Sequence, residues 1–226
     1  AWLSRAPDAI IANSESGRDH HRRAGYRTRR FDVIDNGIDT ARFRPDETGR
    51  ARVRAELGIP ADLPLLALVA RVDPMKDHAG FLDAFRRLSG VGALAVGEGT
   101  DWLPELPGLY RLGMRSDVPG LLAACDLVVS SSAFGEGFSN TIAEGMACGL
   151  PPVATGVGDT ARIIGDAGLV VPPRDPAALA AAITALLNEP PAQRAERGRR
   201  ARRRIEEHFS LSRAVEAFDA LHRGLS

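Results

Sequence analysis

Two glutamates in the segment AFGEGFSNTIAEGMACG stand where carboxylates could do chemistry. Glu136 and Glu144 lie eight positions apart, directly after the apolar run DLVVSSS, and glycines flank the first of them. Glycines let a backbone approach a ligand closely. A helix expected over 138–148 would present first-turn N–H groups near Ser139 and Asn140 as an anion site. Carboxylates beside such a site suit the hydroxyl groups of a sugar and a ribose that phosphates link.

The same stretch also admits a purely structural interpretation. Thr141 and Glu144 match the capping-box pattern T-x-x-E, in which the two side chains cap a helix start. Glycines are also common in strand-to-helix turns. From this stretch alone, the ligand site and the helix cap both stay open.

The segment VARVDPMKD supplies two cations. Arg71 is expected to end a buried strand, and Lys76 follows five residues later, near a helix start. Both could neutralise a diphosphate, and each charged hydrogen bond contributes roughly 1.5–3 kcal/mol. Lys76 is also the single lysine among 29 basic residues, which hints that an ammonium group is needed there. The alternative is ordinary surface charge, with Lys76 paired to Asp73 or Asp77.

Alternating strands and helices must position these residues. Apolar runs predict buried parallel strands at 65–72, 93–97, 109–113, 126–132, 151–155 and 168–172. Amphipathic patterns predict helices at about 78–89, 117–124, 138–148, 159–164 and 175–188. The fold class is therefore α/β, a Rossmann-like parallel sheet with helices on both faces. Ligands of such sheets bind beyond the carboxyl ends of the strands.

Three parts are expected along the chain. Residues 1–43 predict two strands with a helix at about 15–24 between them, which is too little to fold alone. We expect them to be the remnant of an N-terminal domain, and the chain to be a fragment. Residues 44–208 would form the Rossmann-like domain, beginning with a linker at 44–50. Residues 209–226 would form a C-terminal helix.

Composition excludes several classes of function. The formal net charge is zero and the pI is about 7.2, so nothing indicates a nucleic-acid partner. No apolar run approaches the ~20 residues of a membrane span, and no signal-peptide pattern is present. Cys125 and Cys148 lie in apolar runs without metal-ligand spacing. They are expected to be reduced core thiols of a cytoplasmic protein.

Other known motifs are incomplete or absent. GEGTDW follows a predicted strand as a dinucleotide fingerprint would, but Trp102 stands where the third glycine belongs. The sequence contains no GxxxxGK[ST] loop, no HExxH metal motif and no GxSxG elbow. A nicotinamide oxidoreductase and a protein-bound metal are therefore not expected.

The C-terminal segment predicts two helices that meet near Ser210. An arginine cluster in the first helix could touch phosphates or an anionic membrane surface, so peripheral membrane contact is one expectation. The alternative is a solvated helix face balanced by Glu206 and Glu207. The cluster consists of Arg197, Arg199, Arg200, Arg202, Arg203 and Arg204.

Nearly the whole chain resembles the C-terminal half of the family 4 (group 1) retaining glycosyltransferases, which have the GT-B fold. The most specific elements of the resemblance are the Glu-x7-Glu motif from Glu136 to Glu144 and the Arg71–Lys76 pair. Further matching segments are VIDNGIDTARFRP, RLGMRSDVPGLLAACDLVVSSS and LPPVATGVGDTARIIGDAGLVVPPRDPAAL.

The resemblance implies a nucleotide-diphosphate sugar as donor and roles for named residues. Arg71 and Lys76 would hold the diphosphate, Glu136 would contact the donor sugar, and these three would be the catalytic residues. Glu144 would hold the ribose, and the base would lie near Gly113, Met114 and Arg115. The remaining donor-binding candidates are Gly137, Phe138, Ser139, Asn140 and Gly97.

The implied reaction is metal-independent transfer, with retention, of a hexose-type sugar to a glycan or lipid-linked acceptor. UDP is the first candidate nucleotide and GDP the second, and no cofactor beyond the donor is expected. The acceptor would bind to the N-terminal domain, so the fragment is expected to be inactive alone. A polysaccharide or glycoconjugate would be the product.

Two rival functions stay open, namely a non-catalytic sugar-nucleotide-binding module and a GT-B-type sugar-nucleotide epimerase. The last helix, about 211–224, would pack toward the N-terminal domain.

Overall fold

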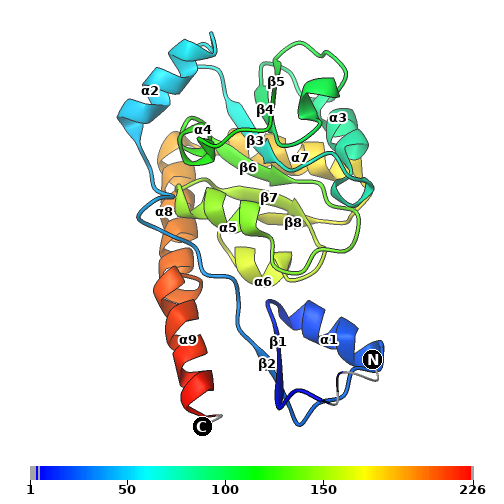
Figure 1. The fold of residues 1–226 in the computed structure, drawn as a ribbon. Coiled ribbons are helices and arrows are strands. Elements are labelled where there is room, and N and C mark those ends of the chain that lie inside the picture. Colours follow the sequence, from blue (N-terminus) through cyan, green and yellow to red (C-terminus); the bar gives the residue numbers. More distant parts are fainter. Residues whose placement is uncertain (1–3, 5, 225–226) are drawn as a thin grey trace.

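The computed structural model describes residue 4 and residues 6–224, and most of them surround one parallel sheet (Figure 1). The six strands lie in the order β5-β4-β3-β6-β7-β8, and each pairs in parallel with its neighbour. Their bounds are β3 Leu65–Val69, β4 Gly92–Val96, β5 Leu109–Gly113, β6 Leu127–Ser130, β7 Pro152–Thr155 and β8 Leu169–Val171. The predicted parallel strands are therefore confirmed, although the first stops at Val69, three residues early.

Helices cover both faces of the sheet, because consecutive strand side chains point to opposite sides. In β3, Leu65 and Ala67 belong to one buried cluster, whereas Leu66 and Leu68 belong to the other. The first cluster includes residues of α2, α4, α5, α6 and α8, and the second includes residues of α3 and α7. The helix bounds are α2 Glu47–Glu56, α3 His78–Phe85, α4 Val118–Ala123, α5 Asn140–Ala147, α6 Thr160–Ile164, α7 Pro176–Leu187 and α8 Pro191–His208.

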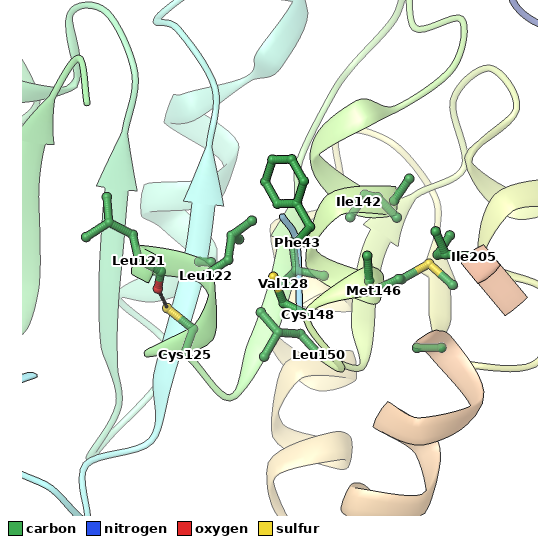
Figure 2. Close-up of a cluster of buried hydrophobic side chains, with 14 of the residues drawn as sticks. Phe43, Leu121, Leu122, Cys125, Val128, Ile142, Met146, Cys148, Leu150 and Ile205 are labelled. Carbon is green, nitrogen blue, oxygen red and sulfur yellow. Dashed lines mark hydrogen bonds between the residues drawn. The ribbon is translucent and has the colours of Figure 1, made fainter. Parts of the chain in front are cut away.

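The first cluster fixes α5, the helix that follows the Glu136 turn. Ile142 and Met146 of α5 are fully buried and lie with Ile205 of α8 in this core (Figure 2). Cys125 and Cys148 are also buried here as free thiols, as predicted. Burial raises the pKa of the Cys148 thiol to about 12, which keeps it protonated and unreactive.

The first part of the chain forms a separate unit next to α6 and α9 (Figure 1). Strands β1 Ala9–Ala12 and β2 Arg30–Val33 pair in parallel, with α1 Glu15–Arg23 between them. Ile38 then forms a parallel bridge with Ser210, where α8 ends and α9 Leu211–Arg223 begins. A Cβ atom at Gly37 would lie 2.7 Å from the Leu211 Cα atom, so the start of α9 lies directly against this segment.

The predicted linker at 44–50 is wrong in its second half. The helix α2 begins at Glu47, and the Asp46 side chain caps it by accepting a hydrogen bond from the Gly49 amide at 2.9 Å. The sequence ETGRARVRAE has a weak apolar stripe. Val53 is its one apolar residue larger than alanine, and Val53 is buried. The helix is held largely through its arginines, which periodicity does not detect.

Arginine side chains cap the carboxyl ends of several helices. Arg202 donates to the Ala147 carbonyl at the end of α5, at 2.6 Å, and Arg204 donates to the Ile163 carbonyl of α6 at 2.8 Å. Such contacts satisfy orphan carbonyls and favour the negative helix end. The other members of the predicted cluster pair with Glu189, Glu196 or Asp166. Arg202 also pairs with Glu206 at 2.7 Å, as the solvated-face interpretation expected. That interpretation is wrong for Arg204, which donates to the Ile163 and Arg162 carbonyls.

Arg54 is the most buried of these cations, with 3% of its surface exposed. Its Nε donates to the Ala124 carbonyl at 2.9 Å, and its Nη2 donates to Asp126 at 2.9 Å. Nη1 donates to three further carbonyls, those of Pro60, Ala61 and Leu63. Asp126 in turn accepts from the Leu65 amide at 2.8 Å, so one guanidinium joins α2, α4 and the start of β3.

We expect Arg54→Met to lower the free energy of unfolding by about 3–5 kcal/mol, since it leaves buried acceptors without their donor. Arg52→Met in the same helix is the matched control, because the Arg52 side chain is 70% exposed. It should change stability by less than about 0.5 kcal/mol. Denaturant titration of both variants measures the difference, and equal losses would contradict the assignment.

Candidate functional site

The loop after β3 carries the two predicted cations. The chain continues alongside β4 beyond Val69, since the Ala70 amide donates to the Val96 carbonyl and the Val72 amide to the Glu98 carbonyl, both at 2.8 Å. Asp73 then caps a short 3-10 turn, Pro74–Lys76, by accepting from the Met75 amide. Lys76 is therefore held at the carboxyl edge of the sheet, between β3 and α3.

Lys76 forms an ion pair with Glu136, and this contact unites the two predicted motifs. The pair is poorly exposed, with 22% of the Lys76 side chain and 8% of the Glu136 side chain accessible. Ser132 donates to the same Glu136 oxygen at 2.6 Å. The pairing of Lys76 with Asp73 or Asp77, which the sequence left open, does not occur. The motifs thus form one site in space.

Backbone contacts fasten the Lys76 loop to the turn after β6. Ser131 donates its hydroxyl to the Lys76 carbonyl at 2.8 Å, and the Ala133 amide donates to the Met75 carbonyl at 2.8 Å. The serine run that follows β6 was not predicted to take part. Its only sequence signal was its place at the end of a buried strand, because hydroxyl groups carry no charge pattern.

Arg71 lies at the same edge but has a different partner. Its side chain is 59% exposed and contacts Asp73 at 3.4 Å. Asp73 has a lowered pKa, mainly because it accepts the Met75 amide hydrogen bond and also because Arg71 is near. The structure therefore places Arg71 beside the Lys76 loop without joining it to Glu136.

The start of α5 contradicts the helix-cap interpretation of the Glu136 segment. Ser139 is the N-cap residue, and α5 starts without a side-chain cap among the described residues. Thr141 instead donates its hydroxyl to the Val69 carbonyl at 2.8 Å, so the capping box is absent. The Phe138 side chain packs edge-on against Phe209 in the core, and only its backbone could meet a ligand. The side chain of Asn140 accepts from Asn36 at 2.9 Å.

The predicted base-binding residues lie at the ends of β4 and β5. The Gly97 amide donates to the Gly113 carbonyl at 2.8 Å, which brings these two strand ends together. Met114 follows, and 81% of its surface is exposed. Arg115 pairs with Asp117 at 2.7 Å, so its charge is already engaged.

Glu144 lies on the second turn of α5 and lines a cavity of about 740 Å³. Burial raises the pKa of Glu144 to about 7, and the nearby Arg42 only partly opposes this shift. Asn13 and Asn140 line the same cavity, as do apolar side chains of α9. Glu144 and the Lys76–Glu136 pair line different cavities, and burial favours the protonated form of the Glu144 carboxyl group.

The described part of the chain holds neither a cluster of metal-ligand side chains nor a helix that could span a membrane. Nowhere in residue 4 or residues 6–224 do three or more histidine, cysteine or acidic side chains gather as metal ligands would. Within the same part of the chain, every helix is too short or too polar to cross a membrane.

The raised pKa of Glu144 predicts a pH-dependent stability difference. Because the folded-state pKa exceeds the unfolded one, Glu144 costs little stability at low pH and progressively more as the pH rises to about 7. We therefore expect Glu144→Gln to be more stable than the parent chain at pH 8 by up to about 3 kcal/mol, with a smaller gain at pH 5. Guanidinium titrations at both pH values measure this.

The control for that experiment is Glu216→Gln, which removes an exposed helical carboxylate. It should show no comparable gain. A constant gain for Glu144→Gln at both pH values would mean that lost charge repulsion or packing, and not the buried ionisation, is responsible.

Comparisons with known proteins identify the family of this chain. A family model described as glycosyl transferases group 1 matches residues 64–189. The D-inositol 3-phosphate glycosyltransferase of Xylanimonas cellulosilytica is 32% identical over 220 residues, covering 87% of this chain and 51% of that protein. The chain thus spans about half the length of the curated relatives it matches.

Solved structures of glycosyltransferases share the fold. Anabaena HepE in complex with UDP-glucose is 25% identical, with a TM-score of 0.88 over 98% of this chain and 65% of that chain. The sucrose-phosphate synthase of Thermosynechococcus elongatus is 26% identical, with a TM-score of 0.85 over 96% of this chain and 58% of that one. The parallel sheet and its helices thus match the C-terminal part of a GT-B glycosyltransferase. This chain belongs to the group 1 glycosyl transferases.

Proposed function

We propose that this chain is the donor-binding part of a family 4-type, retaining glycosyltransferase that takes a hexose-type sugar from a nucleotide diphosphate. The observation that carries the proposal is the Lys76–Glu136 pair at the carboxyl edge of the sheet, beside the start of α5. A cation, a helix N-terminus and an oriented carboxylate at one strand edge suit a diphosphate joined to a sugar.

Lys76 would bind the diphosphate of the donor, and Glu136 would bind its sugar. The Lys76 ammonium and the α5 start would stabilise the charge that develops on the diphosphate leaving group. Glu136, oriented by Ser132, would accept hydrogen bonds from sugar hydroxyl groups. The exposed Arg71 guanidinium is within the same loop and would add a second phosphate contact. No metal or other cofactor enters this scheme, because the protein's own cations supply the positive charge.

The base would lie toward the ends of β4 and β5, and the ribose toward α5. Glu144 would hold the ribose, and the base would meet Gly97 and the Gly113–Arg115 segment. UDP is the first candidate nucleotide, supported by the UDP and UDP-glucose complexes of Anabaena HepE, and GDP is the second. The backbone N–H groups of Gly137, Phe138, Ser139 and Asn140 would face the phosphates and sugar.

For the whole protein we propose a glycan or lipid-linked acceptor bound by the N-terminal domain. Several curated relatives are named D-inositol 3-phosphate glycosyltransferases, which keeps a phosphorylated polyol among the candidates. The part of the relatives that this chain does not match would supply the acceptor site, so the chain alone would bind donor with little transfer. The two buried free thiols are consistent with a cytoplasmic location.

Calorimetric titration of the chain with UDP, GDP, ADP and TDP tests the diphosphate site. We expect micromolar to sub-millimolar binding of one nucleotide, weakened at least about tenfold by Lys76→Ala and further by Arg71→Ala/Lys76→Ala. Arg87→Ala removes an exposed arginine elsewhere and should leave the affinity unchanged. Binding that survives the double substitution would contradict the proposed clamp.

The two rival functions make different predictions for the whole protein. A sugar-nucleotide epimerase would convert a nucleotide sugar without any acceptor, which product analysis detects. A non-catalytic module would bind the donor but keep its cellular role after Glu136→Ala. Robust acceptor-dependent transfer that Glu136→Ala abolishes favours the glycosyltransferase.

A further inference from the structure

Asp159 joins the first unit of the chain to the Glu136 segment. It stands just before α6 and is 5% exposed. Its two carboxylate oxygens accept hydrogen bonds from the backbone amides of Glu15 and Ser16, at 2.8 and 2.9 Å. These amides belong to the first turn of α1, where N–H groups lack helical partners and favour an anion. The carboxylate therefore fastens the first turn of α1 to the start of α6.

The backbone of Asp159 holds the other side of the junction. Its amide donates to the Gly137 carbonyl at 3.1 Å, directly after Glu136. A Cβ atom at Gly158 would lie 2.2 Å from the Glu136 carbonyl oxygen, so the two loops are in backbone contact. One residue thus touches α1 through its side chain and the Glu136 segment through its main chain.

The turn between β1 and α1 lies against the same segment. A Cβ atom at Gly137 would be 2.9 Å from the Ser14 hydroxyl and 3.4 Å from the Asn13 amide oxygen. Ser14 is fully buried and caps α1 by accepting from the Gly17 amide at 3.1 Å. Ser14 and Gly137 are 123 positions apart in the sequence, yet the β1–α1 turn forms one wall of the Glu136 turn.

Arg162 adds further contacts between the first unit of the chain and the start of α6. Its guanidinium donates to Asp159 at 2.8 Å and to Asp35 at 3.1 Å, and it stacks over the Phe209 ring at 5.4 Å. Burial would raise the pKa of Asp159, but the hydrogen bonds from Ser16, Glu15 and Arg162 lower it. The Asp159 carboxylate is therefore ionised and fully engaged by donors.

We propose that Asp159 is a positioning residue of the sugar end of the donor site, acting by tying the first turn of α1 to the Glu136–Gly137 turn. This inference rests on the proposed donor-binding function. Lys76, Arg71 and the start of α5 would still hold the diphosphate without the tie. The sugar contacts of Glu136 depend on where its turn sits, so loss of the tie weakens sugar binding more than nucleotide binding.

Glu15→Pro weakens the tie without changing a residue of the sheet, because it leaves only the Ser16 amide to donate to Asp159. Proline at the first position of a helix is well tolerated, and the preceding Ser14 already has extended backbone angles, φ −162° and ψ 154°. The substitution removes one amide that donates to Asp159. Glu15→Ala is the matched control, because it removes the same carboxylate and keeps the amide. Asp159→Asn changes the acceptor side of the same contact by removing the carboxylate charge. Asp175→Asn, at the start of α7, is its control, because Asp175 also accepts a backbone amide hydrogen bond but lies away from α1.

The probes are UDP and UDP-glucose, titrated calorimetrically into each variant. We expect Glu15→Pro and Asp159→Asn to weaken UDP-glucose binding about three- to tenfold while UDP binding changes less than about twofold. Both controls should leave the ratio of the two affinities at the parent value. Amide hydrogen exchange of residues 136–140, measured without nucleotide, should be faster in Glu15→Pro than in Glu15→Ala.

The outcomes separate this inference from the proposed function. If the parent chain binds UDP-glucose and both variants keep its affinity ratio, Asp159 has only a structural role and the inference is wrong. If the parent chain binds neither probe, the uridine donor is contradicted, and the exchange measurement still decides whether the tie orders the turn. Unchanged exchange in Glu15→Pro would overturn the inference in that case as well. Should Asp159→Asn fail to fold, Glu15→Pro carries the test alone.

Discussion

The Lys76–Glu136 ion pair sets the constraint around which the carboxyl edge of the sheet is arranged. An ion pair with so little exposure is costly to desolvate and persists only with supporting hydrogen bonds and fixed geometry. Ser132 supplies the hydrogen bond to Glu136, while Ser131 and Ala133 fix the backbone of the Lys76 loop. Thr141 ties α5 to the end of β3. Each support comes from a strand end, which is why the parallel sheet and the site are inseparable.

Arginine and lysine have different tasks in this chain. A guanidinium has five donors in a planar fork, and here Arg54, Arg202 and Arg204 use it to satisfy several carbonyls at helix ends. An ammonium is a compact point charge that can move its donors toward a new partner. The single lysine lies at the proposed phosphate site together with the exposed Arg71, whereas Arg54, Arg202 and Arg204 make structural contacts.

The first unit of the chain is part of the site's wall. Its β1–α1 turn touches Gly137, and Asp159 and Arg162 connect it to α6. The segment around Ile38 also bridges Ser210 and packs against α9, so the unit is held at two separate places. A shift of the first unit relative to the sheet would therefore disturb contacts at the Glu136 turn.

Local pattern in the sequence was sufficient for the strands of the sheet, the helices between them and the Lys76 and Glu136 motifs. Apolar runs and glycine turns act over a few residues, so they can be recognised without the fold. Only the tertiary structure decided which partners these residues have. Lys76 and Glu136 are 60 positions apart, and Asp159 and Glu15 are 144 apart. The helix α2 escaped prediction because buried arginine contacts, rather than an apolar stripe, hold it. Thr141 looked like a cap, but the Val69 carbonyl competed for its hydroxyl group. Hydrogen-bond partners across such separations depend on the packing of the whole chain, and no short segment encodes them.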